Sequence, residues 1–199
     1  MKQAKNLMMI QSAIAAISTG AYTDNGDGSI TTDQGITATG MYYDRVNGGE
    51  WQETPNLITN EGLTHILNVA FGTTPKPAGY YLALFSAAAQ PQGSWTAASF
   101  ASTASEIVSM TEGYSSATRP EWKATNTSTQ AIDNMEPSSV AKVTIKTAST
   151  LTVQGAAILT NSAKGSTAGV LISATKYAAA RVFQDGDTYE IGYRLALTI

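Results

Sequence analysis

The clearest pattern in the sequence is a strict alternation of apolar and polar residues at its C-terminal end. Every second side chain there is large and apolar, at Tyr189, Ile191, Tyr193, Leu195, Leu197 and Ile199. This period of two predicts a strand with one buried and one exposed face. We expect Ile191 and Leu195 to lie in the core and Thr198 to face solvent.

Shorter apolar runs upstream predict further strands. They cover residues 80–85, 107–108, 140–145, 151–159, 170–172 and 181–183. Many short strands with turn-rich connections favour a mainly β fold, an antiparallel β-sandwich or jelly roll, over any α/β architecture. The Ala/Ser/Thr-rich stretch 87–105 is predicted to be a long loop or an irregular crossover.

One helix is predicted within this β body. Thr59 can cap its first turn, where Glu61 is favourable, and Gly72 ends it. Its apolar residues repeat at helical spacing, at Leu63, Ile66, Leu67, Ala70 and Phe71. That face is expected to be buried, with His65 on the opposite, polar side.

The first 20 residues are predicted to form an N-terminal helical arm. The arm presents an apolar stripe for contact with another subunit, made of Leu7, Ile10, Ile14 and Ile17. Lys2 and Lys5 before this stretch imitate a secretory signal, but we expect the segment to be retained. It is also too short to span a bilayer.

The rest of the chain divides at a change in composition. Residues 21–50 are rich in Gly, Asp, Asn and Thr and are predicted to form a turn-rich hairpin segment. Residues 51–199 are predicted to form the β-sandwich domain.

Charge narrows the possible partners. Twelve Lys and Arg against 15 Asp and Glu give a net charge of −3, without any basic run, so binding to nucleic acid or to an anionic membrane is disfavoured. Only 14% of residues are charged, which suits a surface that packs against neighbours. The chain has no cysteine and therefore no disulfide or thiolate chemistry.

The sequence offers little for catalysis or metal binding. His65 is the only histidine, and no HExxH, GxSxG, Walker-type or GxGxxG motif is present. Residues 24–30 resemble part of an EF-hand loop, but Thr23 and Gln34 stand where its two essential carboxylates belong. We expect no enzymatic activity, no cofactor and no metal ligand.

Aromatic residues leave one alternative open. Trp51, Trp95 and Trp122 could form a sugar-binding platform, although aromatic residues in strands more often anchor cores or interfaces. Arg119 could place its guanidinium over Trp122, which would be a structural contact.

Several motifs between residues 51 and 199 together resemble a group of tailed-bacteriophage structural proteins. They are Asn56-Leu57-Ile58-Thr59-Asn60-Glu61-Gly62-Leu63, Tyr81-Leu82-Ala83-Leu84-Phe85, Glu112-Gly113-Tyr114-Ser115 with Thr118-Arg119-Pro120 and Trp122, Thr152-Val153-Gln154-Gly155-Ala156-Ala157, Gly169-Val170-Leu171 and Gly186-Asp187-Thr188. The resemblance implies a virion component, described in such phages as a head decoration (cement) protein or as a tail or structural protein. It implies no catalytic residue.

Three functions therefore stand as hypotheses. The first is a capsid decoration protein that binds the outer surface of the head, with the major capsid protein and copies of itself as partners, in a virion assembled in the host cytoplasm. The second is a tail, neck or fibre-associated protein involved in attachment. The third is a glycan-degrading enzyme, for which the sequence shows only scattered carboxylates.

Overall fold

The computed structural model describes residues 22–24, 30–32 and 36–198 of the chain. The chain divides into a unit of residues 1–37 with residue 199, and a unit of residues 38–198. The four apolar residues of the predicted arm, Leu7, Ile10, Ile14 and Ile17, lie outside the described residues, as does Ile199.

Strands β1 (Tyr22–Asp24) and β2 (Ile30–Thr32) form an antiparallel pair in which Asp24 lies opposite Ile30. A hairpin is therefore present within the segment 21–50, as predicted. Residues 25–29, the centre of the EF-hand-like stretch, lie outside the described residues.

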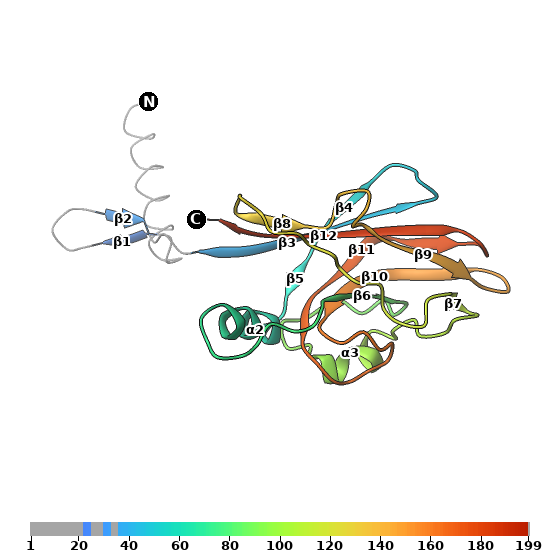
Figure 1. Ribbon diagram of the computed structural model, residues 1–199, viewed down its shortest axis with the longest axis horizontal. Coiled ribbons are helices and arrows are strands. Elements are labelled where there is room, and N and C mark those ends of the chain that lie inside the picture. Colours follow the sequence, from blue (N-terminus) through green and yellow to red (C-terminus); the bar gives the residue numbers. More distant parts are fainter. Residues whose placement is uncertain (1–21, 25–29, 33–35, 199) are drawn as a thin grey trace, which may run out of the picture. The chain divides into compact units, whose positions relative to one another are not determined.

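Two antiparallel sheets form the body of residues 38–198 and confirm a mainly β fold consistent with a sandwich (Figure 1). One sheet has the order β4-β3-β12-β9-β7, with β8 also paired to β12. Its strands are β3 (Thr37–Val46), β4 (Gln52–Pro55), β7 (Gly113–Tyr114), β8 (Ala131–Asp133), β9 (Ala141–Lys146) and β12 (Thr188–Thr198). The other has the order β5-β11-β10-β6, from β5 (Leu57–Ile58), β6 (Tyr81–Phe85), β10 (Leu151–Leu159) and β11 (Leu171–Phe183). Jelly-roll connectivity stays a prediction.

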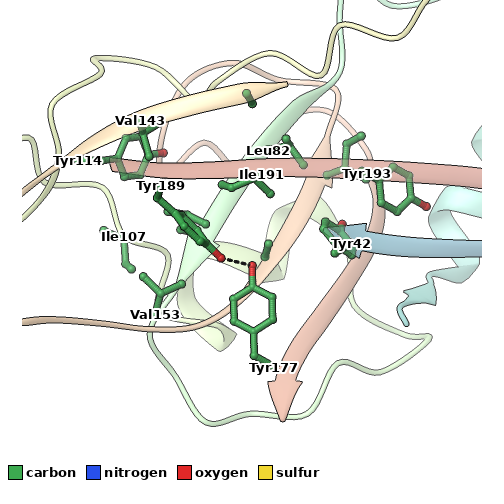
Figure 2. Packing of buried hydrophobic residues seen from close by; sticks show 14 of the residues in the cluster. Tyr42, Leu82, Ile107, Tyr114, Val143, Val153, Tyr177, Tyr189, Ile191 and Tyr193 are labelled. Atoms are coloured by element: carbon green, nitrogen blue, oxygen red, sulfur yellow. Dashed lines mark hydrogen bonds between the residues drawn. The ribbon is translucent and has the colours of Figure 1, made fainter. Parts of the chain in front are cut away.

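The main hydrophobic core lies between the facing sides of the sheets and contains several fully buried tyrosines (Figure 2). Tyr42 packs its ring 4.7 Å from that of Tyr193, centroid to centroid. The Tyr189 hydroxyl donates to the Tyr177 hydroxyl at 2.8 Å, across the core from β12 to β11. This hydrogen bond satisfies the polar ends of two large phenols inside the core, whereas the buried Tyr114 hydroxyl finds no partner among the described residues.

The buried face predicted for the last strand is confirmed for its first half, but Glu190, on the face predicted to be exposed, is buried as well. Tyr189, Ile191 and Tyr193 are buried, whereas Leu195 is only half-buried and Leu197 is 45% exposed. The apolar face of β12 therefore continues beyond the part that the opposite sheet covers.

A second helix, α3 (Ala97–Thr103), corrects the prediction of one helix in the body and of a loop over residues 87–105. Thr96 caps it in a capping box with Ser99. Phe100 points into a second core with Phe85 and Trp95, which covers the outer side of the four-stranded sheet. The expected strand at 107–108 is reduced to one bridge, between Phe85 and Glu106.

The buried tyrosines make the fold sensitive to alkaline pH. Burial raises the pKa above its ordinary value of about 10 in Tyr42, Tyr114, Tyr177, Tyr189 and Tyr193. Above pH 10 the unfolded chain loses phenolic protons that the folded chain keeps, so the free energy of unfolding falls as the pH rises. We expect phenolate absorbance and loss of β-structure circular dichroism to appear together in one cooperative transition.

One half-buried lysine opposes this trend. Burial lowers the pKa of Lys164 to about 8, against the smaller opposing effect of Glu106. Between that pH and its ordinary pKa of about 10.4 the unfolded state binds the extra proton, so this single group makes stability rise with pH.

One result would contradict the predicted burial of the tyrosines. It is a gradual tyrosine titration near pH 10 during which the β-structure circular dichroism stays unchanged.

Candidate functional site

Hydrogen bonds made by Thr59 and Glu61 fix how helix α2 (Asn60–Ala70) is attached to β11. The Thr59 hydroxyl donates to the Leu171 carbonyl at 2.5 Å and accepts from the Gly62 N–H at 3.0 Å, which caps the helix. The Glu61 carboxylate accepts from the backbone N–H groups of Ala97 and Leu171, both at 2.8 Å. It therefore joins α2 to the start of α3 and to the four-stranded sheet.

Gly62 determines which side of α2 faces inward. A Cβ at this position would collide with the carbonyl of Ile172, so only glycine allows this close approach between helix and strand. The side of α2 that carries Gly62 and His65 is consequently the buried side.

The structure corrects the expected burial of the apolar helix face. Leu63 is 43% exposed, Leu67 is 59% exposed, and Phe71, which follows the last turn, is 87% exposed. Ile66 remains half-buried, and Ala70 is exposed. The apolar pattern of this helix marks an outward-facing surface because the Gly62 contact and the Glu61 hydrogen bonds take precedence over apolar burial.

His65, predicted to lie on a polar surface, is instead only 8% exposed. Its Nε2 atom lies 3.1 Å from the Tyr80 hydroxyl oxygen. Burial lowers the pKa of His65, while nearby Glu61 acts in the opposite direction. The neutral imidazole thus ties the helix to the segment before β6.

A cavity of about 590 Å³ lies beside the other flank of α2. Its apolar walls include Ile66 and Val69 from the helix, Ile132 from β8 and Leu195 from β12. Lys76, Glu121 and Lys123 also line it and are solvent-exposed. Cavities of this size and character bind apolar groups from a ligand or another protein.

Aromatic side chains close the inner end of the cavity. The ring of Trp122 lies 5.9 Å from that of Tyr80 and 5.8 Å from that of Tyr193, both edge-on. The Trp122 indole N–H donates to the Tyr193 carbonyl at 2.8 Å. These contacts hold the aromatic wall in one arrangement.

The outer face of α2 and the cavity form one candidate site, here called the α2 surface. It comprises Leu63, Ile66, Leu67, Val69 and Phe71 of the helix region together with Ile132, Trp122 and Leu195 of the cavity. The only charged residue of α2, Glu61, is engaged by backbone N–H groups. A helix that faces water usually carries charge on its outer side, so this one has the character of a protein-binding surface.

The tryptophans do not form one platform. Trp95 is buried against Phe85, Trp122 lines the cavity, and Trp51 packs under the guanidinium of Arg45, 4.4 Å from its ring centroid. Within residues 22–24, 30–32 and 36–198, no group of three or more acidic or histidine side chains is arranged to hold a metal ion. No helix in the same part of the chain is long and apolar enough to cross a membrane.

Arg119 also departs from its expected contact with Trp122. Its guanidinium donates to both carboxylate oxygens of Glu106 at 2.7 Å, and to the Asn161 carbonyl at 2.8 Å. Both side chains of this ion pair are fully buried, and Gly165 donates its N–H to the same carboxylate. The pair fastens three loops together beside β6.

The other motifs of the resemblance also occupy structural junctions. Gly155 of β10 lies against the Thr175 carbonyl and the Phe85 ring, where a Cβ would not fit. Gly169 and Gly186 have positive φ angles of 97° and 84°, which favour glycine. These matched glycines therefore specify the fold, whereas the α2 surface combines two matched residues, Leu63 and Trp122, with residues outside the motifs.

The chain matches no known protein family, and a search of the curated proteins finds no similar sequence.

Proposed function

We propose that this protein is a non-enzymatic structural component of a tailed-phage virion, a capsid decoration protein that binds the outer surface of the head and stabilises it. The motifs of residues 51–199 that resemble tailed-phage structural proteins support the biological setting. The exposed apolar α2 surface is the observation that carries the binding role.

The chemistry of the α2 surface suits attachment to protein. Leu63, Leu67 and Phe71 are exposed side by side without a charged neighbour on the helix, and the adjoining cavity offers apolar walls. Covering such a surface removes apolar area from water at about 25 cal/mol per Å². A rigid β-sandwich below it loses little conformational freedom on binding.

Stabilisation of the head follows from binding alone. A protein that binds only the assembled shell raises the stability of that shell by mass action. The major capsid protein is the proposed partner, and the low charge of this chain permits close packing of copies on one surface.

Replacing Leu67 by Asp is expected to abolish retention on particles because it places a charge in the centre of the α2 surface. Leu67 is 59% exposed, so the isolated protein should keep its thermal midpoint within a few degrees. Co-sedimentation with purified heads measures the effect.

Val182→Asp provides the matched control. Val182 is 61% exposed and lies on β11, ten residues beyond Ile172 and so roughly 30 Å along the strand from the α2 junction. It should leave retention unchanged. Equal retention of the two variants would remove the α2 surface from the account of attachment.

Counting copies tests the proposed function itself. Quantitative mass spectrometry of separated heads and tails should find this chain with the heads, in amounts comparable to the major capsid protein. A few copies confined to tails would instead support the tail, neck or fibre hypothesis.

A further inference from the structure

We infer that the cavity beside α2 receives the N-terminal arm, residues 1–20, of a neighbouring copy of this chain. The inference rests on the proposed function, since copies must lie side by side on one surface. It assigns an occupant to the cavity part of the α2 surface, lined by Ile66, Val69, Ile132 and Leu195.

The cavity calls for an apolar occupant of moderate size. Its volume of about 590 Å³ accommodates several branched aliphatic side chains, and its inner wall is formed by half-buried Trp122 and buried Tyr193. The exposed charges that line it have both signs, Lys76 and Lys123 against Glu121, so apolar fit rather than net charge selects the partner.

The arm has the matching chemistry. The sequence carries no charged residue from Asn6 to Thr23. Within this stretch, one predicted helical face presents Leu7, Ile10, Ile14 and Ile17. An amphipathic segment that places spaced aliphatic side chains in a groove is a recurrent mode of peptide recognition.

The first strand of the sandwich begins at the end of the sheet that contributes to the cavity. The Asn47 N–H donates to the Thr188 carbonyl at 2.9 Å, and Tyr42 packs against Tyr193, so β3 runs antiparallel to β12. The start of β3 therefore lies beside the end of β12, the strand end that contributes Leu195 to the cavity. The first residues of β3 thus lie at the same end of the sheet as the cavity.

The link between arm and strand permits exchange between copies. Residues 21–36 separate the arm from β3. Tyr22 lies opposite Thr32 in the β1–β2 hairpin, so with the hairpin intact residues 21 and 33–36 provide the reach, at most about 18 Å when extended. The arm of one copy and the cavity of the next are two different surfaces. When such a contact repeats around a rotation axis, the copies form a closed ring. Such a ring links decoration subunits without requiring a large flat interface.

Disulfide trapping tests the exchange directly because the chain has no cysteine of its own. One population carries Ile14→Cys in the arm, and a second population, distinguishable by mass, carries Val69→Cys in the cavity wall. The two are mixed and oxidised, both as isolated protein and on purified particles. Val182→Cys replaces Val69→Cys in the control, since Val182 is exposed on β11 outside the α2 surface.

The expected result is a mixed disulfide between the Ile14→Cys and Val69→Cys chains that forms about tenfold or more faster than with the Val182→Cys control, because docking raises the effective concentration of the arm. Deleting residues 1–20 should convert the oligomer to monomer while circular dichroism shows the β-sandwich intact. A truncated chain that loses its β signal would contradict an exchanged arm.

Two outcomes of the trapping would overturn the inference. One is cross-linking at the control rate in both preparations. The other comes from a third preparation, a chain that carries both Ile14→Cys and Val69→Cys: a disulfide that forms within this double variant but not between the two single variants would place the arm in the cavity of its own copy. Neither outcome affects the proposed function, which would fail if the chain were absent from purified heads.

Discussion

Replacing Glu106 by Gln is expected to lower the free energy of unfolding by about 3–5 kcal/mol, because it leaves the Arg119 guanidinium buried without a counter-charge. Both side chains of this pair are fully buried, and two 2.7 Å hydrogen bonds join them. A loss of this size is a large part of the 5–15 kcal/mol that stabilises an ordinary domain. Urea unfolding followed by circular dichroism measures it.

The double variant Glu106→Gln/Arg119→Met is the matched control, because it removes both charges and should recover much of the lost stability. Lys146→Gln provides a second control, since it breaks the exposed ion pair with Asp185 and should change stability by less than about 1 kcal/mol. An urea midpoint for Glu106→Gln equal to that of the unsubstituted protein would show that the buried pair does not hold these loops.

Replacing Ile191 by Asp is expected to abolish folding, because it places an unpaired carboxylate in the core between the sheets at a cost of several kcal/mol. Ile191 is fully buried. Leu195→Asp should still fold, since Leu195 is half-buried and lines the cavity, where a carboxylate can reach water. Circular dichroism and solubility distinguish these two results.

Two further substitutions serve as controls for the Asp variants of β12. Ile191→Val keeps the side chain apolar and should cost about 0.5–1.5 kcal/mol, while Thr198→Asp at an exposed position should be nearly silent. If Ile191, Leu195 and Thr198 tolerated Asp equally, the register of β12 would be wrong.

The strands could be predicted from the sequence because alternation reports directly on an antiparallel sheet with one covered face. That argument holds for Tyr189, Ile191 and Tyr193. The argument weakens at Leu195 and Leu197, where the strand continues past the opposite sheet. The length over which the two sheets cover each other cannot be predicted from the sequence of either strand alone. The cavity could not be predicted for the same reason, because it lies where β12 extends beyond the opposite sheet.

The orientation of α2 could not be predicted from its apolar pattern. Helical periodicity identifies the apolar face but does not say whether it meets the core or a partner. Here Gly62 and the Glu61 carboxylate decide, through contacts with Ile172, Ala97 and Leu171 that are distant in sequence. A sequence signal did exist, since α2 has no charged residue besides Glu61 and so lacks the charged face of an ordinary surface helix.

Helix α3 and the buried ion pair were beyond prediction for a related reason. Apart from Phe100, the residues of α3 are alanine, serine and threonine, which show only a weak helical pattern, and the helix is held by its capping box and by the Glu61 carboxylate. Arg119 and Glu106 have no motif that links them, because only the folded loops bring them together.

A density map of the intact virion tests the central proposal most directly. The account predicts density for residues 38–198 repeated over the outer surface of the head, with Leu63, Leu67 and Phe71 of the α2 surface covered by a neighbouring subunit. Density for this chain found only in the tail, neck or fibres, or on the head with the α2 surface open to solvent, would contradict it.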